Sequence, residues 1–481
     1  MTSVHRDARI GGDGAVVVAA LGVAAVAGAG LPWLPASLLV AGLAGAVVVA
    51  LVVARAVCAA YLVVGLTPLI AGIDRGSAIP FFRPSELLAV LAGIGLIAHH
   101  VVHRSPLRRR LAPTATDVTV VLLALASSIF PLLWLSMRGR AIQHDDILYA
   151  VQIWKYLGIY AIARFSVRTE RDIRTCLWVA MVAAAVVAVI AILQALQLFG
   201  IVVLLQRYFT QYGYAQALAI NRGGATLGLP IAVADLLVFN LAIAFGFLVR
   251  ASDRRQRIAL LGVSALFVAG TFAAGEVSGI VGLAIAGVLL TSLTGRRGYL
   301  VRAVPFVAVT AWLMQPVIQQ RLSQVDPATG IPVSWSGRLE NLQTFFWPKL
   351  FSGFNFALGV RPAARVATAK LATGYVWIES GYTWLLWTGG LPLLAAFAYF
   401  VVANIRRCLR LARRRADALA VLSLAVVVSL TVVAVCMVLD PHLTFRGSAD
   451  LLFVLLGMTV VAQRIDRSEI AVRRALTAVS P

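Results

Sequence analysis

Three charged side chains lie in sequence contexts that suit chemistry: Arg222, Arg338 and Glu379. Arg222, in NRGGATLGLP, stands beside glycines, and a guanidinium on flexible backbone suits phosphate oxygens because its planar fork donates two parallel hydrogen bonds. Glu379, in WIESGYTW, has aromatic neighbours that remove water from its carboxylate, which predicts a pKa raised toward that of a general base. Arg338, in SWSGRLENLQTFFWP, belongs to a positively charged segment that would attract an anion.

Each of these three residues also has a simpler interpretation. Glu379 could mark the start of a helix, where acidic residues are favoured and where Trp and Tyr are ordinary membrane-interface residues. Arg222 could be a loop arginine that extends to the membrane surface, and Arg338 could belong to a solvated loop.

Five further residues are candidates for binding the same anionic ligand. Arg361 and Arg365 follow in GVRPAARV, and His442 and Arg446 lie in LDPHLTFRG. Lys155, in QIWKYLGIY, falls near the middle of an apolar segment, where a charge is costly and usually faces a cavity or another charge. We therefore expect these residues to bind substrate, with plain solvation or ion pairing as the alternative.

Two acidic residues interrupt apolar stretches. Asp235, in IAVADLLVF, is expected to form a structural pair, and Lys155 is one candidate partner. Glu276, in FAAGEVSGI, divides a long apolar run and is expected at a tight turn between two membrane spans.

No metal or cofactor is expected. The four cysteines show no CxxC or Cys/His ligand spacing, and the chain contains no Walker-type loop, dinucleotide fingerprint or HExxH motif. The run His144, Asp145 and Asp146 could ligate a metal only with distant partners, because adjacent residues rarely converge on one ion.

The composition indicates where these residues must lie. The chain of 481 residues is 60% hydrophobic and only 13% charged, and its mean hydropathy is +0.90. Apolar stretches of about 20 residues recur along it, which predicts an all-α, polytopic integral membrane protein instead of a β-barrel of alternating strands. The net charge of +22 is spread in short clusters between apolar segments, so no nucleic-acid partner is expected.

The hydropathy pattern predicts about fourteen transmembrane helices, the first of them an uncleaved anchor. They are expected at roughly 15–31, 36–54, 56–73, 85–102, 117–135, 147–165, 175–199, 229–249, 258–275, 277–294, 299–315, 380–403, 417–438 and 449–463. Most of the 42 lysines and arginines lie in one set of short connections and at the termini, which places both termini in the cytoplasm.

Four regions follow from this layout. Residues 1–199 and 380–481 are expected to hold the N-terminal and C-terminal transmembrane helices, the latter with a basic cytoplasmic tail. Residues 200–315 hold the central helices, with an outer interfacial segment at 200–228 whose aromatic residues suit the membrane surface. Residues 316–379 are expected to form one large extracytoplasmic loop domain.

Taken in order, these motifs resemble the bacterial O-antigen ligase and O-antigen polymerase family. The family's outward arginine before a span, followed by glycine and then proline, is matched by Arg222, Gly223 and Pro230. A small-residue turn is matched by GEVSG, and the opening of a large outer loop is matched by Arg338 and the Trp-Pro pair after it. The later turn is matched by LGVRP, and the closing polar pair with its Tyr-x-x-Leu run by ESGYTWLLWTGGLP. The resemblance covers roughly residues 200–400, and elsewhere it consists of the span layout.

The sequence departs from the family pattern at three places. Glu379 and Ser380 stand where the family usually has His-Asn, and Ile231 stands where an Asn commonly follows the proline. Glu276 or its neighbours replace an arginine that is frequent in the turn motif. Glutamate can perform the same proton transfer as histidine, so the role can survive the change of residue type.

The resemblance implies metal-independent glycosyl transfer at the outer face of the bacterial plasma membrane. The donor would be a polyprenyl-diphosphate-linked glycan, the acceptor a glycan or a lipid, and the product a polymerised or ligated cell-surface polysaccharide. Arg222 and Arg338 would bind the diphosphate, Glu379 would accept the acceptor's proton and Lys155 would add a supporting charge. Membrane lipid and other polysaccharide-assembly proteins are expected as partners.

Two other functions stay open. A transporter or flippase of lipid-linked glycans would show internal repeats and a charged site at mid-membrane, whereas no repeat is found and the candidates cluster on the outer side. A glycosyltransferase that uses monosaccharide-phosphate lipids would carry acidic residues in a long first outer loop, whereas that loop is the short LPWLPAS.

Overall fold

The computed structural model describes residues 36–75, 82–103, 112–209, 222–328, 330, 332–369 and 374–479 of the chain. The predicted span at 15–31, part of the interfacial segment at 200–228 and Lys370 lie outside the described residues. The predictions for those parts of the chain are therefore neither supported nor contradicted by the structure.

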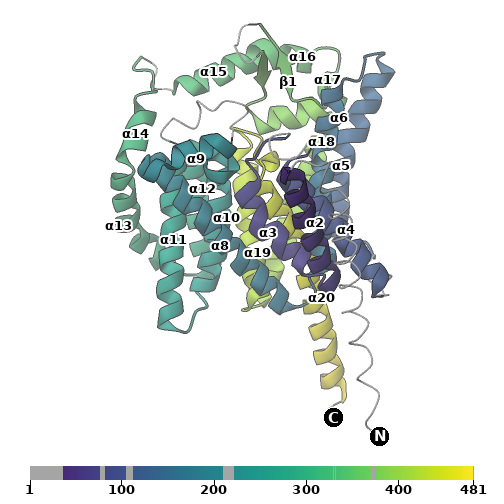
Figure 1. The fold of residues 1–481 in the computed structure, drawn as a ribbon, viewed down its shortest axis with the longest axis vertical. Helices are drawn as coiled ribbons and strands as arrows, with labels where there is room; N and C mark the ends of the chain where they lie inside the picture. Colours follow the sequence, from purple (N-terminus) through teal and green to yellow (C-terminus); the bar gives the residue numbers. More distant parts are fainter. Residues whose placement is uncertain are drawn as a thin grey trace.

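Helices account for most of the described chain (Figure 1). The α-helices are α2 (Ala36–Ala54), α3 (Cys58–Ile70), α4 (Pro84–Val102), α5 (Ala115–Met137), α6 (His144–Ala150), α7 (Gln152–Ser166), α8 (Glu170–Ala195), α9 (Ile201–Tyr208), α10 (Pro230–Leu248), α11 (Arg254–Ala274), α12 (Val277–Thr294), α13 (Gly298–Leu313), α14 (Gln315–Leu322), α15 (Val333–Asn341), α16 (Trp347–Phe351), α17 (Asn355–Leu358), α18 (Gly381–Arg414), α19 (Ala418–Cys436) and α20 (Ser448–Val479). Short 3-10 helices are η1 (Leu198–Gly200), η3 (Ala225–Leu227) and η5 (His442–Thr444), and η4 (Leu342–Phe346) is a π-helix.

Nine helices of the described residues are long and apolar enough to cross a membrane. They are α4, α5, α8, α10, α11, α12, α18, α19 and α20. The pair α13 and α14 passes the same test together but is bent by 73°. The chain is therefore an all-α, multi-pass membrane protein, as its composition predicts.

Each predicted span within the described residues coincides with a helix, but some of these helices are short. α3 has 13 residues and α7 has 15, which is less than the roughly 20 residues that cross a bilayer. The predicted span at 147–165 is divided at Val151, where α6 ends and α7 begins. The total of about fourteen spans therefore stays a prediction.

Two helices, α10 and α19, form the centre of the bundle. Nearly every residue of both is buried, and apart from a few buried polar residues both are apolar on all sides, which is the pattern of a helix enclosed by other helices. α10 packs against α8, α11, α12 and α19. The residues that precede and follow these central helices are thereby held in fixed positions.

The segment between α13 and α18 covers one end of the bundle, which we call the upper end (Figure 1). It contains α14 to α17 and an antiparallel pair of strands, β1 (Arg365–Ala367) and β2 (Tyr375–Trp377), in which Val366 faces Val376. The second strand leads to Ser380, the N-cap residue of α18. The helix starts of the bundle and the hairpin therefore meet at this end.

α18 is broken near its start at Gly390, which has φ +65° and ψ −157°. Near the break the Trp387 carbonyl accepts a hydrogen bond from the Val360 N–H over 2.7 Å. A Cβ at Gly390 would lie 2.5 Å from the carbonyl oxygen of Ala357, so the residue must be glycine. The covering segment is thus joined to α18 by backbone contacts.

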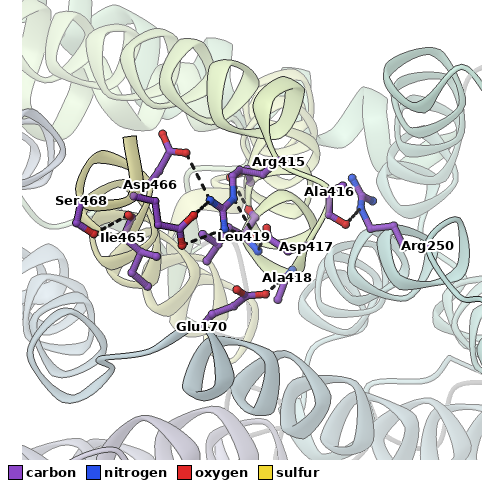
Figure 2. Close-up of polar contacts among 12 residues, drawn as sticks. Glu170, Arg250, Arg415, Ala416, Asp417, Ala418, Leu419, Ile465, Asp466 and Ser468 are labelled. Atoms are coloured by element: carbon purple, nitrogen blue, oxygen red, sulfur yellow. Dashed lines mark hydrogen bonds and ion pairs between the residues drawn. The ribbon is translucent and has the colours of Figure 1, made fainter. Parts of the chain in front are cut away.

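The turn between α18 and α19 lies at the far end of α18 from the covering segment, which we call the lower end. Figure 2 shows the polar contacts around this turn. The Arg415 guanidinium donates to Asp417, the N-cap residue of α19, over 2.8 Å, and it also binds Glu469 on α20. The Ala418 N–H donates to Glu170, at the start of α8, over 3.4 Å. Side chains at the lower end therefore hold three helices together.

Candidate active site

A large cavity lies at the upper end, with a volume of about 1450 Å³. It is lined by one face of α4 and of α7, by the first turns of α10, α12 and α18, and by residues of α14, α15 and both strands. Six of the residues predicted from the sequence line it: Lys155, Arg222, Arg338, Arg365, Glu379 and Arg446. The volume exceeds the roughly 300 to 1,000 Å³ that is common for small-molecule pockets.

Arg222 is positioned by the tight turn that follows it. The Gly223 N–H donates to the Ala273 carbonyl over 2.8 Å, which ties the turn to the end of α11. A Cβ at Gly223 would lie 2.8 Å from the carbonyl oxygen of Ala191 in α8, so only glycine fits. The Arg222 guanidinium forms an ion pair with Glu276, and its buried Nε–H has no hydrogen-bond partner among the described residues. This donor can therefore serve an anionic ligand.

Glu276 lies at the turn between α11 and α12, as the sequence predicts. Gly275 ends α11 with φ +62°, and Glu276 follows as the N-cap residue of α12. The Glu276 carboxylate contacts the guanidinium groups of both Arg222 and Arg321, and its Oε2 is 3.2 Å from Nη2 of Arg321. Two cations share one carboxylate, which leaves positive charge at this side of the cavity.

Arg338, on α15, lies between two carboxylates. Its Nη1 is 2.8 Å from Oδ2 of Asp440, and its Nε is 3.7 Å from Oε1 of Glu379. Ser380 caps α18, because its Oγ accepts a hydrogen bond from the Thr383 N–H over 3.4 Å. Glu379 therefore does not serve as the helix cap, and its side chain, 38% exposed, faces the cavity.

The surroundings of this cluster raise the pKa of its carboxylates Glu379 and Asp440 and lower the pKa of Arg222. Burial raises the pKa of Glu379, Arg338 opposes this shift and the Asp440 carboxylate adds to it. Burial also raises the pKa of Asp440. Burial and the charges of Arg321 and Arg338 lower the pKa of Arg222 to about 9, so Arg222 stays protonated at neutral pH. A desolvated cation gains from an anionic ligand, and a desolvated carboxylate gains from a proton.

Lys155 and Asp235 do not form the pair that was one of the sequence alternatives. Lys155 Nζ lies 3.5 Å from Oδ1 of Asp450, in the first turn of α20. Asp235 is buried and its Oδ2 is 2.8 Å from Nδ1 of His442. The predicted Lys155–Asp235 pair is wrong, because Lys155 faces the cavity whereas Asp235 faces the core. Asp235 still forms a structural pair, but its partner is His442.

Arg361 and Arg365 bind the two aspartates at the start of α6. Arg361 donates to Asp146 over 2.9 and 2.6 Å, and Arg365 donates to Asp145 over 2.7 Å. Burial would raise the pKa of Asp146, but the hydrogen bonds from Arg361 bring it below its usual value. Arg365 also stacks on Tyr375 at 4.2 Å and lines the cavity, whereas Arg361 does not line it. Both aspartates of the metal alternative are thus engaged by arginines.

The two candidates of the loop before α20 lie at different depths. His442 is 1% exposed and is not among the residues that line the cavity. Arg446 lines the cavity, where its Nη1 is 3.7 Å from Oδ1 of Asp74 and donates to the Ala71 carbonyl over 3.3 Å. Only Arg446 is therefore placed to touch a ligand directly.

Charged residues outside the predicted site also line the cavity, among them Arg83, Arg321 and Asp440. Arg321 and Asp440 stand in segments whose charge is visible in the sequence, but Asp440 is 102 residues from its partner Arg338. Arg83 stands just before Pro84, at the start of a span. An arginine just before the start of a predicted span is the signal that could have identified Arg83, as it identifies Arg222.

The cavity therefore combines several cations with a carboxylate of raised pKa, which is a set of groups that can bind a diphosphate and accept a proton. These groups come from segments that are far apart in the sequence and are brought together by the helix ends. No protein-family model matches the chain, and a search of curated proteins finds no significant match.

Proposed function

We propose that the protein is a membrane glycosyl-transfer enzyme that polymerises or ligates a cell-surface polysaccharide from a polyprenyl-diphosphate-linked donor. The observation that carries the proposal is that Arg222, Arg338 and Glu379 line one cavity, with Arg338 Nε 3.7 Å from the Glu379 carboxylate. An anion site beside a proton acceptor is what this reaction requires, because its leaving group is a diphosphate and its nucleophile is a hydroxyl.

The proposed step balances with these groups. The acceptor hydroxyl oxygen attacks the anomeric carbon of the donor sugar, and the bond from that carbon to the diphosphate oxygen breaks. The diphosphate leaves with the electron pair, and Arg222, Arg321 and Arg338 stabilise its growing negative charge. The hydroxyl proton passes to Glu379, whose raised pKa suits a general base.

We place the upper end on the outer face of the bacterial plasma membrane and both termini in the cytoplasm. Support comes from the lower end, where basic residues of 250–257 and 406–415 lie at the ends of α10 and α18. Such an excess of arginine is typical of cytoplasmic connections. The donor and acceptor would then meet at the outer leaflet, with membrane lipid and other polysaccharide-assembly proteins as partners.

Reconstitution of the purified protein with a polyprenyl-diphosphate-linked oligosaccharide and an acceptor glycan tests the proposal. Arg222→Ala and Arg338→Ala should each lower the transfer rate about a hundredfold or more. Glu379→Gln should lower it by roughly 10² to 10⁴, while Glu379→Asp keeps part of the activity. Arg140→Ala and Glu340→Gln, at exposed residues outside the cavity lining, are the matched controls and should be fully active.

Two results would contradict the proposal. A fully active Glu379→Gln variant would show that the carboxylate takes no proton. Movement of unmodified lipid-linked glycan across the liposome, without any new glycosidic bond, would identify a flippase.

A further inference from the structure

An apolar groove lies on the outside of the bundle, and none of the residues that line it lines the large cavity. Its volume is about 380 Å³, and it is lined by residues of α8 and by Val263 of α11. The α8 residues recur at intervals of three or four, which is the spacing of a single helix face, as in Trp178, Val182, Ala185 and Val189. Val182 and Val189 are 62% and 44% exposed. A groove of this size on the face toward the membrane has room for the acyl chain of a lipid.

Two arginines continue the same face of α8 below the groove. Arg174 precedes Trp178 by four residues and Arg171 precedes it by seven, so all three share one side of the helix. Both arginines are exposed, and their side chains form no hydrogen bond or ion pair with the described part of the chain. Their guanidinium groups are therefore available to an anion at the lower end.

A third arginine comes from the neighbouring helix, α11. The two helices pack together, and a Cβ added at Gly270 would lie 3.0 Å from the Cβ of Ala188, so these two residues lie at the same level. Both helices start at the lower end, and counting back from this contact by equal numbers of residues brings Arg255 to about the level of Arg174. Arg255 precedes Val263 by eight residues, so it lies on the groove side of α11. Its side chain is exposed and likewise has no partner among the residues that the structure describes.

The carboxylates near these arginines are engaged by backbone groups. Asp172 and Asp253 accept hydrogen bonds from N–H groups at the starts of α8 and α11. Glu170 accepts a hydrogen bond from the Ala418 N–H, at the start of α19 (Figure 2). The three arginines therefore form a local excess of positive charge, and such an excess favours a negatively charged partner.

We infer that this site binds an anionic phospholipid, with its phosphate at Arg171, Arg174 and Arg255 and one acyl chain in the groove between α8 and α11. Arginine suits the head group because its planar guanidinium donates two parallel hydrogen bonds to phosphate oxygens. Basic pockets between transmembrane helices recognise anionic head groups in the same way. Trp178 lies between the arginines and the rest of the groove, which is the depth at which tryptophan is favoured in membranes. The inference goes beyond the proposed function, since it concerns the other end of the molecule and needs no sugar transfer.

Such a lipid joins the lower ends of the two helices that hold the Arg222 turn at their upper ends. Gly223 packs against Ala191 of α8, and its N–H donates to the Ala273 carbonyl of α11. A ligand that binds the folded protein and not the unfolded chain raises the stability of the folded state. The bound phospholipid should therefore raise the temperature at which the protein unfolds.

Native mass spectrometry of the full chain in detergent tests the site, with phosphatidylglycerol as the anionic lipid and phosphatidylcholine as the neutral lipid. The natural chain should retain one molecule of phosphatidylglycerol and bind phosphatidylcholine more weakly. Arg171→Gln, Arg174→Gln and Arg255→Gln combined should weaken the binding of phosphatidylglycerol about a hundredfold, at about fivefold for each arginine. The same triple variant should lose the rise in unfolding temperature that phosphatidylglycerol gives the natural chain.

Two matched controls accompany the variants of the head-group site and of the groove. Arg406→Gln, Arg410→Gln and Arg413→Gln combined remove three exposed arginines of α18, the same change in charge, and should leave the binding of phosphatidylglycerol unchanged. Ala185→Phe places a ring in the groove and should weaken binding about tenfold, through the loss of roughly ten carbon–carbon contacts. Its control is Ala284→Phe, at an exposed residue of α12, which should bind the lipid as the natural chain does.

Three results would overturn the inference. Equal binding of the two lipids by the natural chain would show that no site selects an anionic head group. Equal losses in the two triple variants would mean that the net charge alone attracts the lipid. A dimer that persists without lipid and dissociates in Ala185→Phe would assign the groove to a second copy of the chain. None of these measurements involves the transfer reaction, so the proposed function is tested separately.

Discussion

At the scale of single residues, Arg338 interacts with two carboxylates, those of Asp440 and Glu379. It lies 2.8 Å from Asp440 and 3.7 Å from Glu379, so each acid influences how strongly the other is paired. Glu379 is the more distant and the more exposed of the two, and burial together with Asp440 raises its pKa against the opposing effect of Arg338. Arg338 is therefore expected to set the pH range in which Glu379 can accept a proton.

The proposed transfer reaction predicts a particular pH dependence from this arrangement. A general base must be deprotonated, so the rate should rise with pH through the pKa of Glu379, which is above the ordinary value of a glutamate. Asp440→Asn removes a negative neighbour and frees Arg338 for Glu379, so the acidic limb of the rate profile should move to lower pH. Arg338→Gln should move it to higher pH. Profiles of kcat/KM against pH measure both shifts, and the control Glu340→Gln should show neither shift. Identical profiles for all variants would exclude Glu379 as the base.

Arg321 offers a second prediction at this scale. It shares Glu276 with Arg222, so Arg321→Gln leaves that carboxylate to Arg222 alone and makes Arg222 less available to a ligand. We expect weaker binding of inorganic diphosphate by about tenfold, the usual scale for one charge-assisted hydrogen bond. Calorimetry of the detergent-solubilised protein measures this, with Arg140→Gln as the control. Unchanged binding in Arg321→Gln would remove Arg321 from the anion site.

The sequence indicates which residues are unusual but not which residues meet. Arg222, Arg338 and Glu379 are recognisable because charges beside apolar segments are costly. Their partners are not recognisable, since Asp440 and Asp450 gain their contacts only when distant helix ends are brought together. The Lys155–Asp235 alternative fails for a related reason: the position of a residue within an apolar segment does not reveal which side of the helix faces a cavity.

At the scale of elements, the site depends on turns that accept only glycine. Gly223 packs against Ala191, and Gly275 provides the positive φ that ends α11 one residue before Glu276. These two turns place Arg222 and Glu276 against each other. The apolar periods of the sequence predict the helices that the turns connect, because burial of apolar surface decides where helices form. They do not predict the break of α18 at Gly390, which depends on a backbone contact from the covering segment.

Gly223→Ala tests the first of these turns. The new methyl group would collide with Ala191, which should destabilise the protein by about 1 to 3 kcal/mol and displace Arg222. Thermal unfolding in detergent and transfer activity should both fall. Gly262→Ala, in an open position of α11, should be neutral or stabilising, because alanine is the better helix former. A Gly223→Ala variant with natural stability and activity would show that the turn can relax.

At the scale of the whole molecule, the two ends of the bundle differ in construction. The upper end is hollow and lined by paired charges, whereas the lower end is closed by the Arg415 network and lined by arginines. The presence of many apolar helices and the difference in charge between the ends are accessible from hydropathy and charge, whereas nine helices of the described residues are long enough to span a membrane and the sequence predicts about fourteen spans. The cavity is not accessible in this way, because it is lined by residues of α4, α7 and the covering segment that lie far apart in the sequence.

The orientation can be measured with single cysteines. Ser336 on α15 and Ser468 on α20 are exposed at the upper and lower ends. In intact bacterial cells a membrane-impermeant maleimide should label Ser336→Cys and not Ser468→Cys. The natural cysteines provide the background control, since three are buried and one is half-buried. The reverse labelling pattern would place the cavity in the cytoplasm and exclude a reaction at the outer leaflet.

The backbone contact between the covering segment and the break in α18 also has a consequence for the order in which parts of the protein fold. The Val360 N–H needs the Trp387 carbonyl as its acceptor, and the Trp387 indole needs the Ala363 carbonyl. A nascent chain that ends near residue 380 has neither partner, so we expect the segment to complete its folding only after residue 387 has been synthesised. The ribosome must first deliver the broken turn, and insertion of α18 then completes the folding of residues that were synthesised before it.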